Sequence, residues 1–171
     1  MINSPKWQKL PQHNEKGEPY PWKDEPNFAY YTDEDSGLDY FINRHYEMGF
    51  LCGYVVVEKD DLPLLRPKTD LCGDPDDQFE AHGGATFCDK FDWQFFKKLP
   101  VYCIGFDCGH GWDLLPFCFI EEFNFIYSPE SRKFKLENDV YRDIKYVQNE
   151  CKKLAKQVAD YLKNHKKEEN S

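Results

Sequence analysis

Two histidines flanked by glycine are the side chains of this sequence best suited to chemistry. His82 precedes Gly83 and Gly84, and His110 lies between two glycines in the segment 105–113, GFDCGHGWD. Glycines this close together indicate a backbone that turns sharply or approaches another group closely. The second segment also carries two aspartates and a cysteine after an apolar stretch, so polar groups gather where a strand is expected to end.

A divalent metal ion is the first ligand that these residue types predict, because imidazole nitrogens and carboxylate oxygens are common zinc donors. Asp107, His110 and Asp113 are spaced three residues apart, so a turning backbone would bring them together. His82 would then be the fourth ligand. A metal with one open position activates water, which makes a metal-dependent hydrolase one hypothesis. The spacing lacks a CxxC or HExxH frame and does not separate zinc from other divalent metals.

The same residues also allow a site without a metal. A pocket for a small ligand such as a nucleotide would use residues of both segments, namely His82, Gly83, Gly84, Asp107, Cys108, His110, Trp112 and Asp113. Alternatively, the histidines and aspartates only brace tight turns through hydrogen bonds to the backbone. A nucleophilic Cys108 is disfavoured, because its neighbour Asp107 on the same strand would point to the opposite face. Whether the protein is an enzyme stays open.

Four extended segments and one helix are expected to position these residues. Residues 50–57, 84–88, 101–106 and 117–127 are short apolar stretches typical of strands. Apolar residues at alternating spacings of four and three predict an amphipathic helix over 139–165, with Asn138 or Asp139 as its N-cap. This order predicts an α+β fold, a small and mostly antiparallel sheet with one long C-terminal helix packed on it.

The composition also predicts the domain organisation. Residues 1–36 are rich in proline and aromatic residues and predict an extended arm. We expect this arm to pack on its own domain, and docking on a partner protein is the alternative. Residues 37–165 form the single α+β domain, and residues 166–171 form a charged tail. Within the domain, the loop of residues 58–80 is acidic but lacks the spacing of a calcium-binding loop.

The charge balance excludes some classes of partner. The chain has 22 basic and 31 acidic residues, a net charge of −9, which disfavours direct binding to nucleic acid. That acidity either serves as ordinary solvated surface or complements a basic partner protein. No stretch is apolar enough for a membrane span or a signal peptide, so we expect no membrane association and a cytoplasmic location. Seven cysteines without regular pairing suit reduced thiols there.

Four motifs in a fixed order carry a family resemblance. They are Gly53-Tyr-Val-Val-Val57, His82-Gly83-Gly84, Gly105-Phe-Asp-Cys-Gly-His110 with Asp113, and Tyr141-Arg-Asp-Ile-Lys-Tyr-Val147. Over residues 45–160 the chain resembles a family of bacteriophage and prophage proteins without an established activity. The resemblance implies action in the cytoplasm of an infected host cell and two turns that meet in space. Gly109 stands where that family has alanine, and the arm has no counterpart in it.

The resemblance also implies a function, because small accessory proteins of phages often act by binding. We expect an inhibitor of a host factor or of a defence system, with a host protein as its partner. The aromatic arm and the acidic loop of residues 58–80 would engage that partner. The alternatives are the metal-dependent hydrolase and a protein that sequesters a nucleotide.

Overall fold

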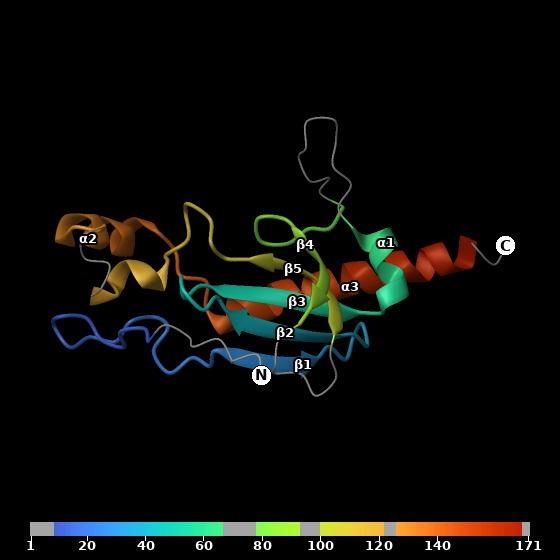
Figure 1. Ribbon diagram of the computed structural model, residues 1–171, viewed down its shortest axis with the longest axis horizontal. Coiled ribbons are helices and arrows are strands. Elements are labelled where there is room, and N and C mark those ends of the chain that lie inside the picture. Colours follow the sequence, from blue (N-terminus) through green and yellow to red (C-terminus); the bar gives the residue numbers. More distant parts are fainter. Residues whose placement is uncertain (1–8, 67–77, 93–99, 122–125, 169–171) are drawn as a thin grey trace.

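A five-stranded antiparallel sheet forms the centre of the protein (Figure 1). The structure is a computed structural model that describes residues 9–66, 78–92, 100–121 and 126–168, with side chains up to residue 165. The strands are β1 Phe28–Thr32, β2 Asp39–Arg44, β3 Leu51–Val57, β4 Phe87–Phe91 and β5 Val101–Asp107, in the order β1-β2-β3-β5-β4. The helices are α1 Leu62–Leu65, α2 Pro129–Asn138 and α3 Ile144–Glu168, with 3-10 turns at Lys59–Asp61 and Pro116–Phe119.

The long helix α3 covers one face of the sheet and packs on β2 and β3 (Figure 1). Val147, Cys151, Leu154 and Val158 form its buried stripe, and each is 0% exposed. Burying a valine or leucine side chain stabilises a fold by about 1.5–3 kcal/mol, so the stripe holds the helix on the sheet. The predicted α+β fold with a C-terminal helix on an antiparallel sheet is confirmed.

Gly53 in β3 determines how closely α3 approaches the sheet. A Cβ there would lie 2.5 Å from Sγ of Cys151 and 2.6 Å from Cζ of Phe106. We expect Gly53→Ala to lower the free energy of unfolding by about 1–3 kcal/mol, because an overpacked core must displace side chains or backbone. Urea unfolding measures the effect. Gly111→Ala is the control, since among the described residues other than its chain neighbours no atom lies within 4 Å of its added Cβ. Equal unfolding midpoints for the two variants would contradict this close packing.

The C-terminal helix begins later than predicted. α3 starts at Ile144, and the carboxylate of Asp143 accepts the N–H of Tyr146 at 2.8 Å as a cap. The predicted caps Asn138 and Asp139 instead end α2. That separate helix exists because Ser128 caps its start and Pro129 is preorganised for a first helical turn.

Only part of the predicted strand pattern is correct. The strands predicted at 50–57 and 101–106 are β3 and β5, whereas the strand predicted at 84–88 lies at Phe87–Phe91. It starts later because Gly83 and Gly84, both with positive φ, belong to a turn. The strand predicted at 117–127 is wrong at its start, where Pro116–Phe119 forms a 3-10 turn that packs in a second apolar cluster. Residues 28–32 of the predicted arm form the edge strand β1.

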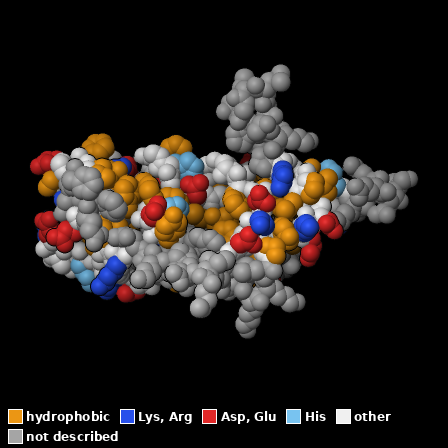
Figure 2. Space-filling model, viewed as in Figure 1, with side chains coloured by type: hydrophobic (Ala, Val, Ile, Leu, Met, Phe, Trp, Pro, Cys, Tyr) orange, Lys and Arg blue, Asp and Glu red, His pale blue; other side chains and the backbone are white. Residues whose placement is uncertain are grey.

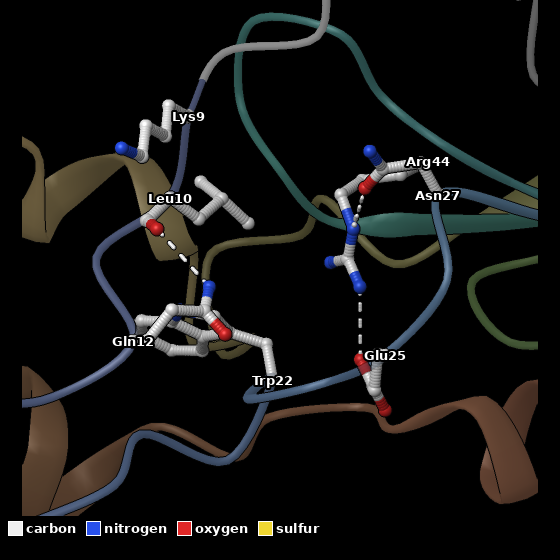
Figure 3. Close-up of a pocket in the computed structure, with 7 residues that line it drawn as sticks. All are labelled: Lys9, Leu10, Gln12, Trp22, Glu25, Asn27 and Arg44. Carbon is white, nitrogen blue, oxygen red and sulfur yellow. Dashed lines mark hydrogen bonds and ion pairs between the residues drawn. The ribbon is translucent and has the colours of Figure 1, made fainter.

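The arm before β1 packs on its own domain. Trp22 is 1% exposed in the second apolar cluster, and its Nε1 donates to the carbonyl of Pro11 at 2.7 Å. Glu25 reaches across to the buried Arg44 of β2, and the two segments line a cavity of about 400 Å³ (Figure 3). The expected docking of the arm on its own domain is confirmed for its described residues.

Parts of several predicted segments lie outside the described residues. These are residues 1–8 of the arm, 67–77 of the acidic loop, 93–99 between β4 and β5, 122–125 of the strand predicted at 117–127, and 169–171 of the charged tail. In the part of the chain that the structure describes, no helix is both long and apolar enough to cross a bilayer. The six cysteines within that part are all free thiols.

Candidate metal centre

The two glycine-flanked histidines are neighbours in the folded chain. The ring centroids of His82 and His110 are 5.1 Å apart. Asp113 joins them, and one nitrogen of each ring and one carboxylate oxygen all lie within 4.8 Å of one another. His82 and Asp113 are buried, whereas the side chain of His110 is 25% exposed. We call these three residues the HHD cluster.

A turn after β5 positions His110 and Asp113. Oδ1 of Asp107, the last residue of the strand, accepts the N–H of Gly109 at 2.8 Å and so bends the chain. The N–H of Asp113 then donates to the carbonyl of His110 at 3.0 Å, which closes a tight turn. The turn places the His110 ring and the Asp113 carboxylate on the same side.

The turn before β4 brings His82 against the same two side chains. Gly83 and Gly84 have φ values of +68° and +91°, a region that glycine enters without steric cost. A Cβ on Gly83 would lie 2.0 Å from Nε2 of His110. Glycine at position 83 therefore allows the two imidazoles to approach each other.

A short backbone bridge adds the start of α3 to the site. Val140 donates to the carbonyl of Trp112 at 3.2 Å and accepts the N–H of Leu114 at 3.0 Å. Residues shortly after Val140 are thereby held beside the turn. Arg142 and Tyr146 follow at this point, and both contact the cluster.

The carboxylate of Asp113 connects all of these segments. Its Oδ2 lies 2.8 Å from Nε2 of His82 and 3.2 Å from Nδ1 of His110, and its Oδ1 accepts from Nε of Arg142 at 3.0 Å. Burial by itself would raise the pKa of this carboxyl group. The hydrogen bonds from His82 and Arg142 outweigh burial and hold the pKa of Asp113 below its ordinary value. Asp113 is therefore an anion in the folded protein.

Tyr146 and Arg142 surround the cluster. The hydroxyl of Tyr146 lies 2.9 Å from Nδ1 of His82, and the guanidinium of Arg142 lies 4.8 Å from the centre of the Tyr146 ring. Neither residue was predicted as part of the site. The sequence signal for both is their spacing of four residues, which would place them on one face of the helix predicted over 139–165. In the structure only Tyr146 belongs to the helix, because α3 begins at Ile144.

The remaining predicted site residues lie at different depths. Asp107 is outside the cluster, and its carboxylate accepts a hydrogen bond from the N–H of Gly109. Cys108 is 2% exposed in the main core, and burial raises the pKa of its thiol above the ordinary value. A thiol held in this form is neither a ready nucleophile nor a ready metal ligand. Trp112 is 58% exposed and stacks on His110.

Charges are mixed over the surface that surrounds these elements. Figure 2 shows acidic and basic side chains interspersed with hydrophobic ones on the face that it presents. A mixed pattern of this kind is typical of solvated surface.

Comparisons with known proteins give no match to this chain. No family model, no curated protein and no solved structure is similar to it.

Proposed function

We propose that this protein is a metal-dependent hydrolase whose ion is bound by His82, His110 and Asp113. The observation that carries the proposal is the convergence of two imidazole nitrogens and one carboxylate oxygen, all within 4.8 Å of one another. Two separate segments supply these side chains, the turn before β4 and the turn after β5. Residues at the start of α3 contact them, with Tyr146 beside His82 and Arg142 beside Asp113. Two histidines and one carboxylate are a donor set found in catalytic metal sites.

The hydrogen bonds around the cluster support this proposal. A metal-binding histidine usually donates its other ring N–H to a neighbouring group, and Nδ1 of His82 lies 2.9 Å from the Tyr146 hydroxyl. A metal-binding carboxylate is usually hydrogen-bonded through its second oxygen, and Oδ1 of Asp113 accepts from Arg142. These contacts would orient both ligands before an ion arrives.

Three protein ligands favour a catalytic site over a structural one. Structural zinc sites commonly have four protein ligands, whereas catalytic sites keep a position for water. The partly exposed His110 ring places that open side toward solvent. A metal-bound water loses a proton near neutral pH and becomes a nucleophile for hydrolysis. The donor set suits Zn²⁺ and Fe²⁺, and we use zinc as the probe.

The interpretation as an inhibitor of a host factor or defence system stays a prediction. It follows from the family resemblance, and it assigns the contacts with the partner to two segments. In the arm, the large aromatic side chain of Trp22 is packed inside the protein and is not available to a partner. Residues 67–77 of the acidic loop lie outside the described residues.

Metal content tests the proposed hydrolase directly. After zinc loading and extensive dialysis, the wild type is expected to retain about one equivalent of zinc by elemental analysis. His110→Ala should retain less than about a tenth of an equivalent, because it removes one of only three ligands while leaving the buried side chains in place. The matched control is His13→Ala, which removes an exposed imidazole of the arm. Equal zinc in the two variants, or none in the wild type, would refute the site.

A further inference from the structure

Arg142 has unused donors beside the HHD cluster. Its Nε donates to Oδ1 of Asp113 at 3.0 Å, and its side chain is 22% exposed. Among the described residues, its two terminal amino groups have no hydrogen-bond partner. A guanidinium held in this way offers paired N–H groups whose geometry matches a phosphate.

A metal ion in the cluster would stand next to this guanidinium. Asp113 would bind the ion through Oδ2 while its Oδ1 holds Arg142. The two positive charges of the ion and the one of Arg142 exceed the single negative charge of Asp113. The site would therefore attract an anion locally, although the whole chain has a net charge of −9. One phosphate can contact a metal ion and a guanidinium through different oxygens.

Trp112 presents a flat aromatic surface beside the same cluster. Its ring is nearly parallel to that of His110, with an angle of 8° between them and centroids 5.0 Å apart. One face of the indole thus covers His110, and within the described residues the other face has no aromatic partner. The side chain is 58% exposed. An exposed indole face of this kind stacks well on a nucleobase.

We propose, on the basis of the proposed hydrolase, that its substrate is a mononucleotide, with the phosphate between the metal ion and Arg142 and the base on Trp112. The metal-bound water gives a proton to solvent, and its oxygen bonds to phosphorus. The bond between phosphorus and the ribose oxygen breaks, and that oxygen takes a proton from solvent. The products are a nucleoside and inorganic phosphate. A nucleic-acid polymer fits less well, because the net charge of −9 repels its backbone.

Binding measurements on the zinc-saturated full chain test this assignment, with adenosine 5′-monophosphate, adenosine and inorganic phosphate as probes. The mononucleotide should bind most tightly, and phosphate should be released from it. Arg142→Gln should weaken binding of the mononucleotide and of phosphate by at least about tenfold but leave adenosine unaffected. Trp112→Ala should weaken binding of the mononucleotide and of adenosine but leave binding of phosphate unchanged. Lys145→Gln, which removes an exposed charge at the start of α3, should change each affinity by less than about twofold.

Zinc content, measured first for every variant, separates the two proposals. A wild type without zinc contradicts the hydrolase itself. If zinc is bound but the mononucleotide binds no better than adenosine and phosphate, only the substrate assignment is overturned. It is also overturned if the mononucleotide binds equally well after zinc is removed with a chelator, or if a single-stranded oligonucleotide binds more tightly.

Discussion

Asp113→Asn is expected to lower the zinc affinity by more than about 100-fold, because it neutralises the only carboxylate of the HHD cluster. The same change should lower the free energy of unfolding of the metal-free protein by about 3 kcal/mol. Hydrogen bonds to charged groups contribute about 1.5–3 kcal/mol each, and this carboxylate is shared by His82, His110 and Arg142. Competition with a chromogenic chelator measures the zinc affinity. Urea unfolding in the presence of a chelator measures the free energy of unfolding of the metal-free protein.

Asp107→Asn is the matched control for this prediction. It removes the other aspartate of the same segment, the residue that the sequence pattern also predicts as a ligand. An asparagine Oδ1 can still accept the N–H of Gly109, so the turn keeps its hydrogen bond. Zinc affinity should stay unchanged, and the free energy of unfolding should change by less than about 0.5 kcal/mol. A loss of zinc as large as that in Asp113→Asn would mean that the ligand set is wrong.

The pH dependence of unfolding gives a second readout for Asp113. Its pKa in the folded state is held below the ordinary 3.8. A depressed pKa contributes stability above the pKa of the unfolded state, and that contribution is lost as the pH falls through the folded value. In a chelator, the stability difference between the wild type and Asp113→Asn should be largest above about pH 5 and should shrink below about pH 4. A difference that stays constant over this range would rule out a shared, ionised Asp113.

The meeting of the two histidine turns follows from strand pairing rather than from spacing along the chain. β4 and β5 are antiparallel neighbours, with Phe87 opposite Gly105 and Phe91 opposite Val101. The residues before β4 and the residues after β5 therefore lie at the same edge of the sheet. The residue types at this edge could be read from the sequence, but the pairing of β4 with β5 could not. A hydrophobic pattern predicts where a strand lies and does not predict which strand it pairs with.

The partner of Arg142 illustrates the same limit. From the sequence, the expected ion-pair partners of Arg142 are the nearby carboxylates of Asp139 and Asp143. In the folded chain Asp139 pairs with Lys135 and Asp143 caps α3, so Arg142 turns to Asp113. The apolar stripe of α3 was predictable because apolar residues recur along one continuous segment. The contact of Arg142 with Asp113 was not, because it depends on the backbone bridge between Val140 and the turn after β5.

The contact between Arg44 and Glu25 is expected to be the most sensitive point of the arm. Their side chains are 2% and 10% exposed, with Nη2 and Oε2 3.0 Å apart. Glu25 also accepts the hydroxyl of Tyr141 and the N–H of Ile144, so this carboxylate ties the arm to both β2 and α3. Arg44→Met and Glu25→Gln should each lower the free energy of unfolding by about 3–5 kcal/mol, because each leaves a buried charge without its partner.

A double-mutant cycle separates this loss from a simple packing defect. The variant with both substitutions should be less destabilised than the sum of the two single variants, because no charge then stays buried alone. The control pair is Lys23 and Asp24, whose side chains are 38% and 81% exposed at an N–O distance of 3.5 Å. Breaking that pair should cost less than about 1 kcal/mol. If Arg44→Met cost no more than this in urea unfolding, the arm would not be anchored through Glu25, and its docking would rest on Trp22 and its apolar neighbours alone.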